Sequence, residues 1–265
     1  MDFTGPQMVL TIKVTSLAMS LTDGARRKAG AVLAHARWDE KALDDLPSPL
    51  EFFGYVFFFP CFLAGPVFEM SDYLAFIDGS AFAGETDKDG RPPTVSPSSL
   101  LPTAKKVGVA LACGAVFQVC GTFPQSFYFA SEFAQRPLVW RLGYAYVAQQ
   151  AVKFKYYFAW LLAEGSCIAS GLSYNGRDPA DPTGQTIAWN RMVNVRPLAV
   201  ETADSFKVAV ENWNVAIATW LKWSVYHRIV PTTTRTPPFW AVLTTNMFSA
   251  LWHGTNCRGD SSFVF

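Results

Sequence analysis

Long uncharged apolar runs dominate the hydrophobic pattern of this chain. Residues 107–131 form a run of 25 residues without a single charge. A bilayer core about 30 Å thick needs about 20 mostly apolar residues in a helix, so this run predicts a membrane-spanning helix. Residues 52–68 form a second uncharged run, rich in aromatic side chains and interrupted by Gly and Pro. Membrane helices tolerate such breakers where neighbouring helices satisfy the backbone.

The other apolar segments are shorter or interrupted by charges. They comprise residues 8–21, 144–172, 214–230 and 237–252. With the two runs above, they predict an all-α, polytopic membrane protein with about five or six membrane-associated helices, in a single domain over residues 1–265. A buried soluble core is the alternative, but a soluble domain of this length would not carry so many uncharged runs. Most of the charge, Pro and Gly falls in connecting stretches, which are residues 22–49, 70–105 and 173–206.

Composition supports a membrane environment and excludes several functions. Half of the 265 residues are hydrophobic and only 16% are charged, against about 25% in a typical soluble domain. The net charge of +1 and the absence of like-charge blocks argue against a nucleic-acid partner. Four of the five cysteines lie in apolar runs, which favours reduced thiols over a disulfide framework. No Cys/His cluster has metal-ligand spacing, and no glycine-rich phosphate loop is present.

Two polar residues inside apolar segments are candidates for chemistry. Asn214 would share a helical face with the side chains at 218, 221 and 225, where it could bond a neighbouring helix or serve a site. His253 ends the last apolar segment. A neutral imidazole in a low-dielectric site suits a general base, whereas the alternative is an interfacial histidine capping a helix that stops at Gly254.

The remaining ionisable residues of these segments receive structural interpretations. Glu164 is expected to pair with Lys153 or Lys155, or to mark the membrane edge. His35 and His227 lie in or next to charged stretches, and both are expected to be solvated or interfacial without a functional role.

Five stretches together resemble a known family. They read DFTGPQMVLTIKVTSLA at 2–18, GYVFFFPCFLAGPVFEMSDYLAFI at 54–77, KFKYYFAWLLAEGSCIASGL at 153–172, NWNVAIATWLK at 212–222 and LWHG at 251–254. In sequence and in order they resemble the membrane-bound O-acyltransferases, and within them the fungal lysophospholipid acyltransferases. The match covers most of the chain, so it is far more specific than a lone WHG.

The resemblance implies an active site made of Asn214 and His253, the latter 39 residues further along the chain. It also implies a multi-pass endoplasmic-reticulum protein that moves a fatty acyl group from acyl-coenzyme A to the free hydroxyl of a lysophospholipid. No metal or tightly held cofactor is implied, because coenzyme A arrives with the substrate. The side chains of Trp213, Trp220 and Trp252 are candidates for lining the substrate tunnel, with ordinary helix packing as the alternative for each.

The implied chemistry agrees with these residue types. An alcohol becomes a good nucleophile when a base within hydrogen-bond reach accepts its proton, which His253 can do. Asn214 can stabilise the thioester oxyanion or orient the imidazole or the substrate, and the sequence leaves these roles open. Two alternatives also stay open: a family member that acylates a sterol, diacylglycerol or protein, and a non-catalytic membrane scaffold. The lysolipid head group, the oligomeric state and the membrane orientation are not readable from the sequence.

Both ends of the chain depart from the family pattern. The family continues WHG with a Pro-Gly-Tyr turn and further helices, whereas here TNCRGDSSFVF follows. DFTGPQM is normally an internal motif, and here it follows Met1 directly. We therefore expect a partial family domain in which residues 255–265 are an aberrant tail. A base must be held to within about 0.5 Å of its working position, so this chain alone is expected to be weak or inactive.

Overall fold

The structure, a computed structural model, describes residues 3–82, 98–183, 186–230, 236 and 238–253. Within these ranges the chain is helical, and the one β-type pairing is an isolated bridge between Arg177 and Ile187. This confirms an all-α fold for the described part of the chain. Gly254, the expected helix stop after His253, and the predicted tail at 255–265 lie outside these ranges, as does part of the connecting stretch expected at 70–105.

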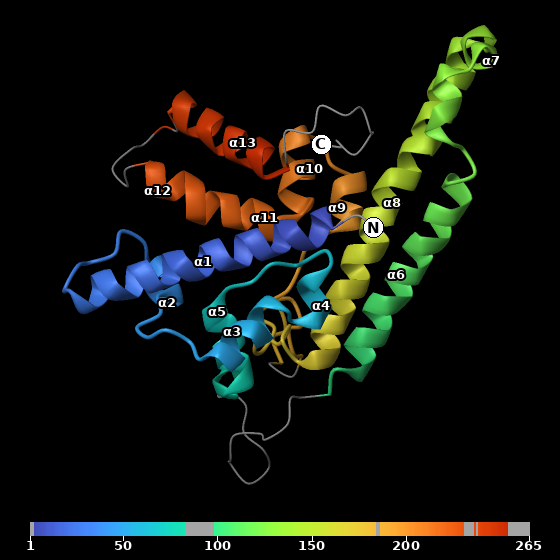
Figure 1. The fold of residues 1–265 in the computed structure, drawn as a ribbon. Coiled ribbons are helices and arrows are strands. Elements are labelled where there is room, and N and C mark those ends of the chain that lie inside the picture. Colours follow the sequence, from blue (N-terminus) through green and yellow to red (C-terminus); the bar gives the residue numbers. More distant parts are fainter. Residues whose placement is uncertain (1–2, 83–97, 184–185, 231–235, 237, 254–265) are drawn as a thin grey trace.

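Helix α1 (Thr4–Lys28) is longer than the predicted segment 8–21 and runs through the middle of the molecule (Figure 1). Its buried residues include Ile12 and Leu17, about 140° apart around the helix axis, which belong to two different apolar clusters. Three basic residues occupy its last turn, where they complement the negative end of the helix dipole. The helix stops just before Gly30, whose φ of +84° is disfavoured for other residues.

The apolar run 52–68 does not form one membrane-length helix, which corrects the sequence-based expectation. It is divided between α3 (Pro49–Val56) and α4 (Phe59–Phe62), and α5 (Met70–Ile77) follows. Ser48 and Glu51 form a reciprocal capping box at the start of α3. Pro60 lies at the start of α4, where a missing N–H costs nothing. Gly65, at a φ of +87°, and Pro66 prevent continuation.

A long antiparallel pair projects from the rest of the molecule (Figure 1). The two long helices are α6 (Leu100–Cys120) and α8 (Leu138–Ser170). The short helices η2 (Gln125–Phe129) and α7 (Ser131–Gln135) connect them. Helix α8 confirms the helix expected at 144–172 and extends it toward the N-terminus. Gly171, in a left-handed conformation at φ +94°, follows its last turn.

Among the described residues, one segment is both long and apolar enough to cross a membrane, Leu100–Phe129. Only 11% of its most apolar window is buried in the structure, so its apolar side chains face outward, unlike those of a soluble core helix. Of the five or six membrane-associated helices predicted, several of them short or interrupted, one meets these criteria of length and composition within the described residues. The other runs carry charges, as α8 does, are divided into short helices, or form a shorter uncharged helix, as α13 does with 15 residues.

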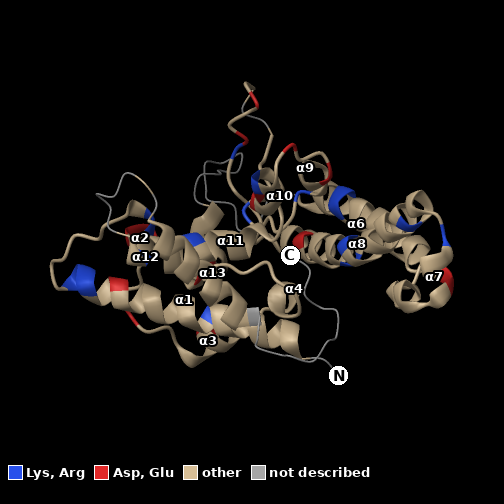
Figure 2. Cartoon of the chain, turned by 90° about the horizontal axis from the view of Figure 1, so that it is seen from above, with Lys and Arg blue, Asp and Glu red and all other residues tan. Residues whose placement is uncertain are grey.

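Shorter helices complete the described chain. They are α2 (Ala36–Lys41), the 3₁₀ turn η1 (Ser80–Phe82), α9 (Pro197–Glu201), α10 (Phe206–Asn212), α11 (Val215–Trp220), the π-helical turn η3 (Leu221–Tyr226), α12 (His227–Ile229) and α13 (Phe239–His253). Figure 2 shows the charged residues as scattered patches on a mostly uncharged chain, and none lies on α13.

Three apolar clusters join these elements. One links α1 to α3, α4 and α5, the second links α6 to α8, and the third links α1 to α11 and η3. The expectation of reduced thiols holds for the four described cysteines, all of which are free. Cys61 and Cys167, both fully buried, contact each other at 3.2 Å between their sulfurs. Cys257 lies outside the described residues.

Candidate active site

Three aromatic side chains of helix α8 pack against Trp213, the residue before Asn214. Tyr156, Tyr157 and Trp160 lie within one turn of this helix, so their side chains project together. All three contact Trp213, with ring centroids 5.9, 5.5 and 5.0 Å from its own, in edge-to-face arrangements. Edge-to-face aromatic pairs stabilise beyond simple area burial. Trp213, the residue before Asn214, is thereby anchored to α8.

One turn further along α8, Glu164 holds a second chain segment in place. Its side chain is 1% exposed, and its Oε1 accepts hydrogen bonds from the backbone N–H groups of Asn194 at 2.7 Å and Val195 at 3.0 Å. Its Oε2 accepts from Lys106 Nζ of α6 at 2.7 Å. The expected pairing of Glu164 with Lys153 or Lys155 is wrong, because the carboxylate points across the α6–α8 pair instead of along α8.

The segment held by Glu164 in turn positions Asn214. The Asn194 carbonyl accepts from the Val215 N–H at 2.7 Å, and the Arg196 N–H donates to the Asn212 carbonyl at 3.0 Å. These bonds lie on either side of Asn214, whose backbone is left-handed with φ +48° and ψ +51°. Outside glycine, asparagine is one of the residues that tolerates this conformation best. Asn214 therefore precedes α11 as its cap residue, and its carbonyl accepts from the Ala218 N–H at 3.0 Å. The π-helical turn η3 then interrupts the regular helical spacing on which the predicted face with positions 218, 221 and 225 depends.

The end of α13 packs against the same region. Trp252 donates from Nε1 to the Met8 carbonyl of α1 at 3.1 Å, and it packs on the cluster of Ile12, Trp220 and Val225. Ile217, three residues after Asn214, packs on this cluster too. His253 is the last residue of α13. The structure thus brings Trp252, the neighbour of His253, and Ile217 of α11 to the same apolar cluster, while the imidazole lies outside the described side chains.

Residues 1–258 match the model of the membrane-bound O-acyltransferase family. The chain belongs to this family. It is 36% identical to a lysophospholipid acyltransferase of Schizosaccharomyces pombe over 265 residues, which cover 99% of this chain and 50% of the relative. It is 35% identical to membrane-bound glycerophospholipid O-acyltransferase 1 of Mus musculus over 96% of this chain and 50% of the relative.

A lysophospholipid acyltransferase of Saccharomyces cerevisiae is also similar, at 32% identity over 96% of this chain and 42% of the relative. The chain thus spans about half the length of the curated relatives it matches. Membership in the family establishes a membrane protein, and the family expected from the sequence motifs is confirmed.

The three tryptophans expected near the site have defined contacts. Trp213 lies against α8, and Trp252 is bonded to α1, as described above. Trp220 is buried and donates from Nε1 to Ser16 Oγ of α1 at 2.9 Å. Each of the three therefore packs between helices, in agreement with the alternative stated from the sequence.

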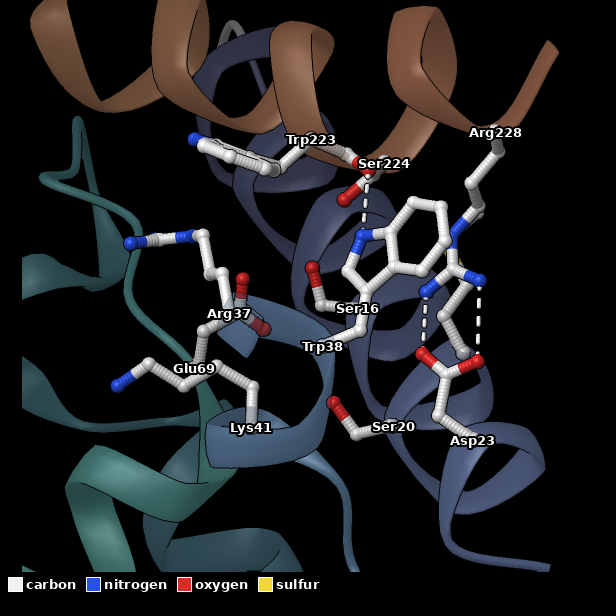
Figure 3. A pocket seen from close by; sticks show the side chains of 11 residues that line it. Ser16, Ser20, Asp23, Arg37, Trp38, Lys41, Glu69, Trp223, Ser224 and Arg228 are labelled. Carbon is white, nitrogen blue, oxygen red and sulfur yellow. Dashed lines mark hydrogen bonds and ion pairs between the residues drawn. The ribbon is translucent and has the colours of Figure 1, made fainter. Parts of the chain in front are cut away.

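A separate polar hollow lies between α1, α2 and η3 (Figure 3). Arg228 bonds the carboxylate of Asp23 through both terminal nitrogens, at 3.1 and 2.5 Å, and Trp38 Nε1 donates to the Trp223 carbonyl at 3.1 Å. Burial, reinforced by the nearby charge of Asp72, raises the pKa of Glu69 at the edge of this hollow. Neither Asn214 nor Trp213 lines it. These bonds therefore join α12 to α1 and η3 to α2 outside the candidate site.

His35 and His227, expected to be solvated or interfacial, lie next to each other. Both are partly buried. Their rings lie 4.8 Å apart, and each contacts a tryptophan at 4.6 Å, Trp38 for His35 and Trp223 for His227. They form an aromatic cluster beside the hollow.

The structure also identifies two residues near Asn214 that sequence reasoning did not place in the site, Glu164 and Asn194. The sequence alone could have indicated Glu164, because it is the one acid in the otherwise apolar stretch 156–172. Asn194 carried no such signal, since it lies in a polar connecting stretch. Among the described residues, no group of three or more His, Cys, Asp or Glu side chains lies close enough to hold a metal ion.

Proposed function

We propose that this chain carries the catalytic centre of a lysophospholipid O-acyltransferase that uses acyl-coenzyme A as the acyl donor. The observation that carries the proposal is the arrangement around Asn214. Its left-handed backbone is held between Trp213 on α8 and the Asn194–Val215 hydrogen bond. Helix α13, which ends at His253, packs through Trp252 on the cluster around Trp220, the last residue of α11.

In the proposed reaction His253 accepts the proton of the lysophospholipid hydroxyl as its oxygen attacks the thioester carbon. The carbonyl oxygen becomes negatively charged, and the Asn214 carboxamide donates a hydrogen bond to it or orients the acceptor. Collapse of the intermediate breaks the C–S bond, and the proton on His253 passes to the departing coenzyme A sulfur. The products are a phospholipid and free coenzyme A.

The apolar surroundings would protect the thioester from hydrolysis by excluding water. We propose that Trp213, Trp220 and Trp252 contribute to the wall of an acyl tunnel while they pack between helices. We further propose an endoplasmic-reticulum membrane location, with several helices besides Leu100–Phe129 lying in or on the membrane. The assignment of a phospholipid acceptor rests on the names of the relatives, which are lysophospholipid or glycerophospholipid acyltransferases.

The test measures transfer of a labelled acyl chain from acyl-coenzyme A in microsomes, with lysophospholipids, a sterol and diacylglycerol as acceptors. Two proteins are compared: the full chain, and a chimera in which residues 1–253 replace the matching stretch of the S. pombe relative. We expect the chimera to acylate lysophospholipids and His253→Ala to abolish this activity. Transfer only to the sterol or diacylglycerol would overturn the acceptor class, and full activity of His253→Ala would overturn the mechanism. A well-folded chimera without any transfer would favour the scaffold alternative.

A further inference from the structure

Asn194 has a buried carboxamide whose hydrogen-bonding capacity is not used. The residue is 1% exposed, yet neither Oδ1 nor Nδ2 has a hydrogen-bond partner within the described part of the chain. Most buried polar side-chain atoms in folded proteins have a partner, and leaving one unpaired is unfavourable. A side chain with both a donor and an acceptor unpaired is suited to bind a group that brings its own acceptor and donor.

Two hydrogen bonds hold the backbone of Asn194 in place. The side-chain carboxamide therefore cannot find hydrogen-bond partners by moving out to solvent. The backbone N–H donates to Glu164 Oε1 at 2.7 Å, and the backbone carbonyl accepts from Val215 at 2.7 Å. Glu164 is itself anchored by Lys106. Asn194 is therefore held from two sides by buried hydrogen bonds.

The unpaired amide lies next to the candidate site. The bond to Val215 places Asn194 across from the start of α11, beside Asn214. On another side it faces the corner at Gly65, where an added Cβ would lie 4.0 Å from Asn194 Nδ2. Residue 65 is a glycine, so no side chain from that residue contacts the amide.

We infer that the Asn194 carboxamide binds the glycerol part of the lysophospholipid acceptor, an inference that rests on the proposed function. Before the reaction Oδ1 accepts a hydrogen bond from the free glycerol hydroxyl, which turns to His253 when it attacks, and Nδ2 donates to the carbonyl of the neighbouring fatty ester. A 1-acyl lysophospholipid presents this donor and this acceptor on adjacent carbons. The acyl-coenzyme A thioester presents only an acceptor, so it would leave Oδ1 unpaired.

The test compares binding of two ligands to the purified full chain in lipid nanodiscs, followed by tryptophan fluorescence. One ligand is a 1-acyl lysophospholipid, and the other is its 1-alkyl ether analogue, which lacks the ester carbonyl. We expect the wild type to bind the ester about 5- to 10-fold more tightly than the ether, the range expected for one hydrogen bond. In Asn194→Leu this ratio falls to about one. The matched control is Asn190→Leu, an exposed position in the same connecting stretch, which keeps the wild-type ratio.

Thermal stability separates binding from a structural role. Since Asn194→Leu replaces an unpaired buried amide with an apolar side chain of similar size, its melting temperature should equal or exceed that of the wild type. A wild-type ratio near one, a ratio unchanged in Asn194→Leu, or a lower melting temperature together with loss of both ligands would each overturn the inference.

The transfer assay above, run in parallel, distinguishes this inference from the proposed function. Transfer by the chimera with an unchanged ester-to-ether ratio in Asn194→Leu overturns the role of Asn194 alone. A collapsed ratio with no transfer overturns the catalytic proposal and leaves the binding role of Asn194 intact.

Discussion

At the residue scale, Asn214 combines two properties that a single substitution normally removes together. Its backbone is left-handed, a conformation that costs most residues about 1–2 kcal/mol, and its side chain is the proposed hydrogen-bond donor of the reaction. The surrounding contacts, Trp213 on α8 and Val215 on Asn194, act on the backbone. The two properties can therefore be tested separately.

Asn214→Gly keeps the backbone conformation and removes the carboxamide, whereas Asn214→Ala also introduces strain. In the chimera we expect both variants to lower kcat about 100-fold, the effect of removing one oxyanion donor. Only the alanine variant should also lose about 1 kcal/mol of stability, measured as a lower melting temperature. If Asn214→Gly kept the wild-type kcat, Asn214 would have only a conformational role.

The Lys106–Glu164 ion pair should respond differently to the loss of either partner, because the two side chains differ in burial. The Lys106 side chain is 27% exposed and that of Glu164 is 1% exposed. Lys106→Met leaves a buried carboxylate without its cation and should cost about 3 kcal/mol. Glu164→Gln should cost less, because its amide oxygen still accepts the two backbone N–H groups and Lys106 can reach solvent.

Chemical denaturation measures the free energy of unfolding of the two single variants and of the double variant Lys106→Met/Glu164→Gln. The double variant should recover most of the stability that Lys106→Met loses. Equal losses in both single variants would mean that the carboxylate is solvated, in conflict with the buried network.

At the scale of the element, the position of α13 depends on its last turn. Its first part is exposed, with Trp240 at 52% exposure, whereas Trp252 is bonded to the Met8 carbonyl and packs on the cluster around Trp220. Helix α13 carries no charged side chain. Its orientation relative to α1 and α11 thus comes from apolar contacts and this hydrogen bond.

Trp252→Phe removes that hydrogen bond while retaining an aromatic side chain. We expect a loss of about 1 kcal/mol in stability and a clear decrease in kcat of the chimera, because the end of α13 carries His253. Trp240→Phe, on the exposed part of the same helix, is the control and should change neither quantity. A normal kcat in Trp252→Phe would show that this bond does not position the histidine.

At the scale of the whole molecule, the parts of α6 and α8 next to α7 project beyond the other helices (Figure 1). Helix α6 has 21 residues, about 32 Å at 1.5 Å per residue, close to the thickness of a bilayer core. Large apolar side chains such as Leu111, 60% exposed, and Val119, 66% exposed, cover its surface. This distribution is expected of a helix solvated by lipid.

Leu111→Lys places a charge near the middle of this helix and should raise the apparent free energy of membrane insertion by about 2.5–3.5 kcal/mol. Leu101→Lys, at the helix end, should have a much smaller effect because the ammonium can reach the interface. A glycosylation reporter that carries residues 98–124 measures the apparent free energy of membrane insertion for both variants. Equal penalties at the two positions would argue against a transmembrane orientation of α6.

The sequence by itself determined the helical class, the membrane environment and the family, because these depend on local properties: uncharged runs, spacing and short motifs. It also indicated Asn214 and His253, which remain proposals for the catalytic role. Only the tertiary structure decided that the run 52–68 is divided into short helices and that Asn214 precedes α11 with a left-handed backbone. It also decided that Glu164 pairs with Lys106 and that Asn194 lies buried beside Asn214. These features depend on contacts between residues 20 to 60 positions apart, and the periodicity of a single segment carries no record of which distant segment it meets.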